Sequence, residues 1–444
     1  MHRPSKSLHA VLVALTLSVA SLAKCEEPHL LREAFTAGYH YHVSCRVEVS
    51  GNLTLPAEKN QSVPQTLKVN GNSAIEYDER ILDPGANGRE PKTARIYRRI
   101  DFQRKIGDRT QESTIRNNVR RLVVLRLQNK EVPFSPDGPL TWSEIDLVRT
   151  DVFTPALAGM LPNRPVRIGE QWTADRSAIQ ELTDMERIDE GQVECRFEHI
   201  TTLSNRRHAR VSFSGTVRGI NEDGPNKQQL DGYFFFDLES NHLGYLSLKG
   251  VNSMLDKDGK TLGSVEGVFV LTRQLHTRAP ELSDEALRNV ALEPNADNTQ
   301  LLYENPDLGI RFLHARRWHV AGVRGSQVAL DEARGSGLLI TVEPSGRIPT
   351  AAQFLNETRT YLQQQKAKIQ RIDPPHRLPA APNDMDRFTL QVEVTGQRVV
   401  MDYFVIRQAS GGAILTARLL PDDLVNLQKE VEQVARSIQI GNVK

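Results

Sequence analysis

Apolar and polar residues alternate with a period of two along much of residues 39–276. The alternating segments are residues 66–81, 94–106, 121–127, 209–220, 230–238, 244–255 and 263–275. This period is typical of β-strands that bury one face. Turn residues such as Asp258 and Gly259 separate the segments, as they do in β-hairpins. We therefore expect residues 26–277 to form an antiparallel β-sheet domain, either open or curved into a half-barrel.

Two short helices interrupt this alternation. Thr141 and Glu144 form a capping box ahead of an apolar run, which is typical of a helix start. Thr154 precedes Pro155, and Pro162 follows a few residues later. Proline is tolerated at the first position of a helix but not in its interior. We therefore expect a second short helix that begins at Pro155 and ends before Pro162. Both helices are expected to belong to the β-sheet domain.

The pattern changes after residues 278–298, an acidic segment that we interpret as a linker with one short helix. Residues 299–440 combine short strands with two amphipathic helices, one after Thr350 and one from Asp422. The expected strands are residues 310–313, 327–330, 338–342, 388–394, 398–406 and 413–420. The mixed pattern predicts a second domain of α/β type. The whole chain is therefore expected to have an α+β fold of two domains.

Residues along this second domain match a known family. The matching residues are Tyr303, Gly309, Ile310, Phe312, Trp318, Pro344, Tyr403, Ser437, Ile438 and Ile440. Together they resemble the PsbP-like fold of the photosystem II extrinsic subunit and its bacterial relatives. One departure is Arg317, which stands where such domains often carry a proline before the tryptophan. The resemblance implies an α/β/α sandwich and an accessory or interaction module without a shared active site.

A shorter resemblance occurs in the first domain. Its residues are Pro165, Val166, Gly169, Glu170 and Trp172. They resemble a recurrent element of exported bacterial β-rich proteins of unassigned function. Physically, the segment is expected to be a rigid extended crossing anchored by the tryptophan.

The first residues of the chain predict export. Arg3 and Lys6 precede an uncharged apolar run that ends near Ala23, which is typical of a signal peptide over residues 1–23. That run is shorter than the ~20 residues of a membrane helix, and no later run approaches this length. Cys25 follows at the position of the lipid-modified cysteine in a bacterial lipoprotein motif, although Lys24 replaces the small residue that usually precedes that cysteine. We expect an exported protein, periplasmic or secreted, without a transmembrane segment.

The charge balance limits the expected partners, and the cysteines raise the question of a disulfide. The chain has 56 basic and 55 acidic residues, a balance that argues against a dedicated nucleic-acid binder. Cys45 and Cys195 both lie on the apolar face of an expected strand. In an oxidising compartment they could form a disulfide if their strands are neighbours, or remain two buried thiols.

Two groups of side chains could carry chemistry or binding. His40 and His42 lie on the polar face of the first strand, at a spacing that suits two ligands of one zinc ion. Residues 92–126 contain 11 basic and three acidic residues. Within them, Arg95, Arg99 and Lys105 are expected on one face, which would either be solvated or attract an anionic partner.

Three functions agree with these observations. The first is an exported, non-catalytic binding or scaffold protein of the cell envelope, with other envelope proteins as partners and no cofactor. The second is a carrier of an apolar or lipid ligand with an architecture similar to LolA-type carriers. Its concave sheet would be lined by Tyr41, Val43, Val47, Ile96, Ile100 and Phe102. The third is a metal-assisted hydrolase that uses His40 and His42. The sequence contains no glycine-rich phosphate loop and no nucleophile motif that would favour an enzyme of another class.

Overall fold

The computed structural model describes residues 27–55, 65–85, 91–127, 130–221, 224–275, 278–379 and 382–441. The expected signal peptide and Cys25 lie outside these residues. Within them, the fold is β-rich, with antiparallel sheets and few helices. None of the described helices is long and apolar enough to span a membrane.

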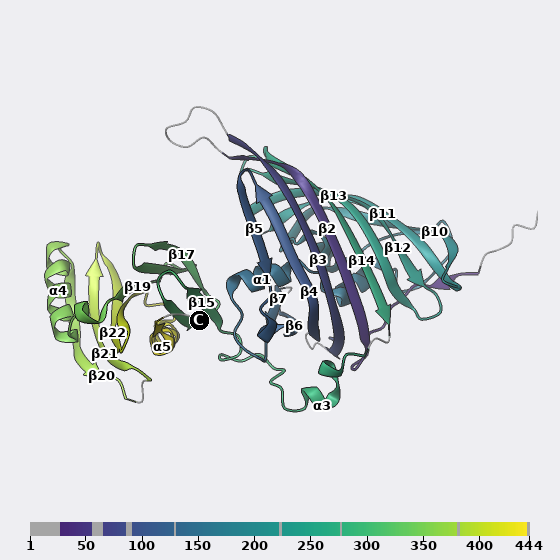
Figure 1. The fold of residues 1–444 in the computed structure, drawn as a ribbon. Coiled ribbons are helices and arrows are strands. Elements are labelled where there is room, and N and C mark those ends of the chain that lie inside the picture. The colour runs from purple at the N-terminus through teal and green to yellow at the C-terminus, as the bar shows by residue number, and fades with distance from the viewer. Residues whose placement is uncertain are drawn as a thin grey trace, which may run out of the picture.

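A large antiparallel sheet occupies the first two thirds of the described chain (Figure 1). Its strands are β2 (His40–Leu55), β3 (Gln65–Asp83), β4 (Lys92–Ile106), β5 (Arg109–Thr114), β6 (Arg121–Leu127), β7 (Lys130–Phe134), β9 (Gln171–Thr173), β10 (Arg187–Leu203), β11 (Arg206–Asn221), β12 (Gly224–Asp237), β13 (His242–Leu255) and β14 (Thr261–Leu275). Their order is β7-β6-β4-β3-β2-β14-β13-β12-β11-β10-β9, and β5 pairs with the far end of β4. A separate pair joins β1 (His29–Leu30) to β8 (Pro165–Val166).

Short helices cover part of the inner face of this sheet. They are α1 (Trp142–Arg149), the 3-10 helix η3 (Thr154–Met160) and α2 (Arg176–Thr183). Their apolar side chains share one core with the inward residues of the strands. The predicted capping box is present at the start of α1, where Thr141 and Glu144 each accept a backbone N–H of the other. The sheet therefore curves around the two helices expected from the sequence.

A β-bulge in β4 changes which of its side chains face the core. Tyr97 and Arg99 pair with consecutive residues of β3, so Arg98 is an extra residue in β4. Before the bulge, Arg95 and Tyr97 point inward and are 0% and 1% exposed. Ile96 instead packs on the outer face. The predictions that Arg95 lies on a solvated face and that Ile96 lines the inner face are therefore wrong, because a bulge reverses the alternation of a strand.

A segment between the two parts of the chain packs on that outer face. It contains η4 (Pro280–Leu282) and α3 (Asp284–Leu287). Leu282 and Leu287 are buried there against the outward side chains of β4. Glu281 binds Arg98 with both carboxylate oxygens, at 2.7 and 3.0 Å. The acidic segment thus neutralises part of the basic surface of β4.

Residues 301–440 form two further sheets and two longer helices (Figure 1). The strands are β15 (Leu301–Asn305), β16 (Ile310–His314), β17 (Trp318–Arg324), β18 (Gln327–Glu332), β19 (Gly337–Glu343), β20 (Lys368–Arg377), β21 (Asp384–Val394), β22 (Gln397–Gln408), β23 (Gly411–Leu419) and β24 (Gln439–Ile440). The larger sheet has the order β17-β18-β19-β23-β22-β21-β20, and β15-β16-β24 form the smaller one. The 3-10 helix η5 (Ser345–Arg347) precedes α4 (Ala351–Gln364), and α5 (Leu424–Ser437) lies near the end. Side chains of α4 and α5 join two separate cores, each with alternate residues of β22, so the helices lie on opposite faces of the larger sheet.

The cysteines do not form a disulfide in this fold. Cys45 and Cys195 are both buried free thiols. Cys45 lies in β2 and Cys195 in β10, and four strands separate β2 from β10 in the sheet. At about 4.8 Å per strand, this separation far exceeds the ~7 Å between Cα atoms that a disulfide tolerates. Of the two alternatives left open by the sequence, the structure therefore has the two buried thiols and not the disulfide.

Candidate ligand-binding site

A groove of about 910 Å³ lies between the helices and the inner face of the large sheet. Val47, Phe102, Leu248 and Phe269 form its sheet wall, from β2, β4, β13 and β14. The opposite wall comes from α1 and α2, with Ile145 among its apolar residues. This volume lies within the range of pockets that hold small-molecule ligands.

The groove exists because the helices are shorter than the strands that they cover. β2 has 16 residues and spans roughly 50 Å, whereas α1 has eight residues and spans about 12 Å. Tyr41 and Val43, near the start of β2, are fully buried under the helical segment. Further along the same strand, Val47 is only partly buried. The inner face is therefore packed at one end and open at the other.

The structure divides the six residues that the sequence placed around a ligand. Val47 and Phe102 line the groove. Tyr41, Val43 and Ile100 belong to the packed core, with 0 to 2% of their surface exposed. The prediction that these three line an open cavity is wrong, because the helices fill the inner face beside them. Ile96 lies on the opposite face of the sheet, as described above.

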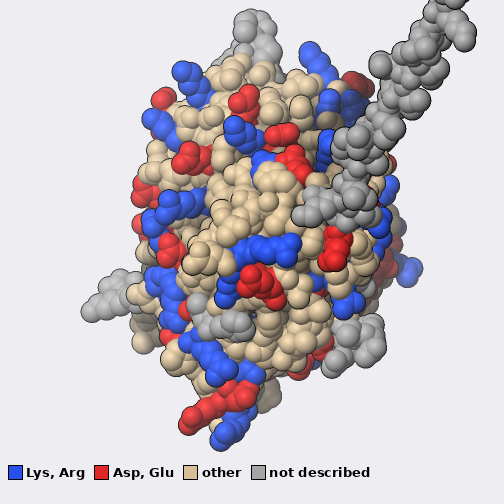
Figure 2. Space-filling view, turned by 90° about the vertical axis from the view of Figure 1, so that its right-hand side faces the viewer, with Lys and Arg blue, Asp and Glu red and all other residues tan. Residues whose placement is uncertain are grey.

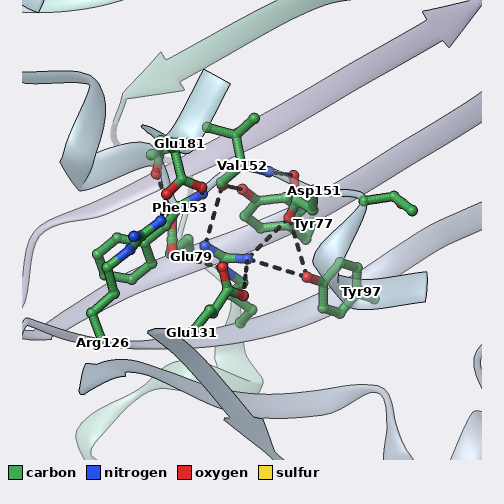
Figure 3. Close-up of polar contacts among 12 residues, drawn as sticks. Tyr77, Glu79, Tyr97, Arg126, Glu131, Asp151, Val152, Phe153 and Glu181 are labelled. Atoms are coloured by element: carbon green, nitrogen blue, oxygen red, sulfur yellow. Dashed lines mark hydrogen bonds and ion pairs between the residues drawn. The ribbon is translucent and has the colours of Figure 1, made fainter. Parts of the chain in front are cut away.

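A buried polar cluster closes the packed end of the groove (Figure 3). The Arg95 guanidinium donates to Glu79 Oε1 at 2.7 Å and to Asp151 Oδ2 at 3.0 Å. Tyr97 donates to the same Asp151 oxygen at 3.2 Å. Thr154 donates to the second oxygen of Glu79 at 2.7 Å. Every carboxylate in this set has a hydrogen-bond donor, as buried charges require.

Burial and the guanidinium act in opposite directions on these carboxyl groups. Burial by itself raises the pKa of Glu79, but the charge of Arg95 and three hydrogen bonds bring it below its ordinary value. For Asp151, burial outweighs Arg95 and raises the pKa to about 6. Burial raises the pKa of Glu131 to about 7, although the Arg95 guanidinium lies 4.0 Å from its carboxylate and opposes the rise. Asp151 and Glu131 also line the groove, so its inner end changes charge near neutral pH.

Sequence reasoning missed most of these residues. Glu131, Asp151 and Phe269 come from three distant parts of the chain. One available indication was Glu79, a carboxylate that continues the inward positions of Ile75 and Tyr77 in an otherwise apolar face. A charge at such a position predicts a buried partner.

The surface proposed to attract anions is only partly free. Arg99 is exposed and pairs with Asp101 at 2.5 Å, and Lys105 is exposed. Arg95 is removed from this surface by the bulge. On the face shown in Figure 2, basic and acidic residues are intermixed. An anion site composed of Arg95, Arg99 and Lys105 therefore does not exist as predicted.

His40 and His42 lie two residues apart on the same face of β2. The Nδ1 atom of His42 lies 2.9 Å from Asp78 Oδ1. Burial, together with Arg80, lowers the pKa of His40. Across the described ranges, no three His, Cys, Asp or Glu side chains are grouped so that they could hold a metal ion. The third ligand that the predicted zinc site needs is therefore not supplied by these residues.

Comparison with known proteins gives no family. No family model matches the chain, and no curated protein matches it. Among solved structures, PsbP (CyanoP) from Synechocystis sp. PCC 6803 is 13% identical, covering 32% of this chain and 92% of its own, with a TM-score of 0.25. MucB is 13% identical over 93% and 95% of the two chains, with a TM-score of 0.22. Lipovitellin is 8% identical over 66% and 29%, with a TM-score of 0.34. Likeness at this level carries no conclusion about function.

Proposed function

We propose that this protein is an exported, non-catalytic binding protein of the cell envelope that holds an apolar or amphipathic ligand. The observation that carries the proposal is the groove, with Val47, Phe102 and Phe269 on its wall. An apolar wall that ends in a few convergent polar groups is typical of small-molecule sites. Export rests on the sequence of residues 1–23.

The proposal assigns separate roles to two domains. Residues 26–277 would form the ligand-binding domain, and residues 299–440 a PsbP-like accessory domain, joined by residues 278–298. Contacts between the two support this division of roles. The Trp142 ring at the groove stacks on His319 with centroids 4.7 Å apart, and its Nε1 donates to Trp318 O at 3.4 Å. The second domain would therefore support one wall of the groove.

The packing of the polar cluster supports a binding role over catalysis. Arg95 and Glu79 expose 0% of their side chains, and the side chain of Asp151 is equally enclosed. Each is held by an ion pair in the core. Groups in this state stabilise one arrangement of the inner face. The partly buried apolar residues nearby remain available for a ligand.

The first test is native mass spectrometry of the full mature chain, purified from its own export compartment. A retained apolar molecule would appear as added mass. The same protein is then titrated with N-phenyl-1-naphthylamine, a neutral apolar probe whose fluorescence rises on transfer from water. We expect saturable binding.

Two tryptophan variants locate the probe. Val47→Trp fills the groove, whereas Val268→Trp adds the same volume on the opposite face of the adjacent strand, where Val268 is 40% exposed. We expect Val47→Trp to weaken probe binding about tenfold or more, because a blocked pocket loses several buried CH₂ groups at ~0.8 kcal/mol each. Val268→Trp should leave the affinity unchanged. Failure of the probe to bind, or equal effects of both variants, would refute the proposed groove.

A further inference from the structure

Most charged side chains that line the groove have a partner in the protein. Arg126 pairs with Glu181, and Asp151 pairs with Arg95. Asp146 and Arg149 also take part in polar or electrostatic interactions. The Arg126–Glu181 and Arg95–Asp151 ion pairs are therefore neutralised in place.

Arg316 differs from these residues. It lies in the short segment of chain that connects β16 to β17, and its side chain lines the groove. Its Nε donates to Thr299 O at 3.0 Å, and its Nη2 donates to Pro133 O in β7. These two carbonyls orient the guanidinium, but neither carries a charge. Among the described residues it has no carboxylate partner, and burial lowers its pKa to about 10.

The neighbouring Arg317, by contrast, has carboxylate partners. Arg317 pairs with Asp423 at 2.7 Å and with Glu430 at 3.2 Å. It does not line the groove. A partly buried guanidinium normally has such a partner, because desolvating a cation is costly unless an anion replaces the lost water. The Arg316 guanidinium has five N–H donors. Its Nε and Nη2 atoms each donate to a carbonyl, so further N–H donors remain for an anion.

We propose that Arg316 binds the carboxylate or phosphate headgroup of an amphipathic ligand whose apolar chain lies along Val47, Phe102 and Phe269. The inference rests on the proposed function of the groove and names the chemical class of its ligand. A guanidinium matches both headgroups with two parallel hydrogen bonds. The second domain would thus supply the charged anchor and the large sheet the apolar wall.

The test compares three amphiphiles with the same alkyl chain. Dodecanoate, dodecyl phosphate and the uncharged dodecanol displace N-phenyl-1-naphthylamine from the full chain at about pH 7.5, where a carboxylate is ionised. In Arg316→Gln we expect the dissociation constants of both anions to rise about tenfold or more, because a charge-assisted bond is lost. Dodecanol should change by less than about twofold. The ratio between the two anions identifies which headgroup the site prefers.

Two further variants control for structural damage. Arg316→Lys keeps the charge and loses the two-pronged geometry, so anion binding should lie between those of the wild type and Arg316→Gln. Arg317→Gln removes the same charge one residue away and should leave all three affinities unchanged. If Arg316→Gln misfolds, the comparison of Arg316→Lys with Arg317→Gln still decides the question.

The outcomes separate the two proposals. If Val47→Trp weakens all three amphiphiles but Arg316→Gln leaves the ratio of dodecanoate to dodecanol affinity unchanged, the headgroup inference is wrong and the groove stands. Equal weakening of dodecanol and dodecanoate by Arg316→Gln also refutes the inference. If no amphiphile binds, the groove proposal fails and this inference fails with it.

Discussion

Replacing Arg95 by methionine is the sharpest test of the buried polar cluster. Arg95→Met keeps an apolar stem of similar length and removes the guanidinium that faces Glu79 at 2.7 Å and Asp151 at 3.0 Å. Both carboxylates then remain in the core without a cation. Breaking a buried ion pair from one side costs about 3 to 5 kcal/mol. We expect the free energy of unfolding of the large-sheet region to fall by about this amount at about pH 8.

The loss should depend on pH in a defined direction. Burial raises the pKa of both carboxyl groups, and in wild type Arg95 opposes this. Without Arg95, the folded-state pKa of Glu79, which Arg95 helps to hold below its ordinary value in wild type, should rise above the unfolded value, and that of Asp151 should rise further above it. A raised carboxyl pKa lowers stability as pH increases from the unfolded to the folded pKa. The deficit of Arg95→Met should therefore be smaller at about pH 5 than at about pH 8, by about 1 kcal/mol or more.

Urea unfolding of the full chain, followed by circular dichroism at both pH values, measures this effect. Arg99→Met on the same strand is the matched control, because the Arg99 side chain is 52% exposed and pairs with the exposed Asp101. An exposed pair contributes about 1 kcal/mol or less. A deficit below about 1 kcal/mol for Arg95→Met, or one that grows toward acid pH, would show that Arg95 does not neutralise the buried carboxylates.

Two other predictions follow from buried groups. Without reductant, Cys45 and Cys195 should both react with iodoacetamide in denaturant, and neither should react in the native state. The reason is that both thiols are buried, and burial raises their pKa values, that of Cys195 to about 12. Detection of a cross-linked Cys45–Cys195 peptide by mass spectrometry would contradict this prediction. Burial also raises the pKa of Glu131 to about 7, so wild type loses stability between about pH 4.5 and pH 7 as this group ionises. Glu131→Gln lacks that loss and should gain up to about 3 kcal/mol relative to wild type over the same interval, whereas a difference in unfolding free energy that stays constant with pH would refute the assignment.

The alternation of apolar and polar residues was enough to predict most of the long strands of the large sheet, but not the short strands β5, β7 and β9. Capping and proline motifs predicted the capping box at Thr141 and the two short helices that follow it. These features depend on neighbours within a few residues of one another, so local patterns carry them. The outer-face position of Ile96 could not be predicted. Arg98 is an extra residue in β4, and it reverses the order of inward and outward side chains on one side of the bulge relative to the other.

The candidate site was predicted only in fragments. Val47 and Phe102 were assigned correctly to an inner face that could hold a ligand. That Tyr41 and Val43 are covered while Val47 is open depends on where α1 ends along the strands, a relation between segments about 100 positions apart. Arg316 was not among the site residues predicted from the sequence, which singled out only its neighbour Arg317 as a departure from a family pattern.

The sequence by itself determined the β-rich character of the chain, several helix starts and the polarity of most strand faces, because these follow from capping motifs and from periods of two or about 3.6 residues. Tertiary structure alone decided strand order, and with it the separation of Cys45 from Cys195. It also decided which charges meet. Arg95 binds Glu79 and Asp151 in the core, whereas Arg316 lines the groove and donates its hydrogen bonds to two backbone carbonyls. The physical reason is that a charge shows its sign in the sequence, but its partner depends on how the whole chain packs.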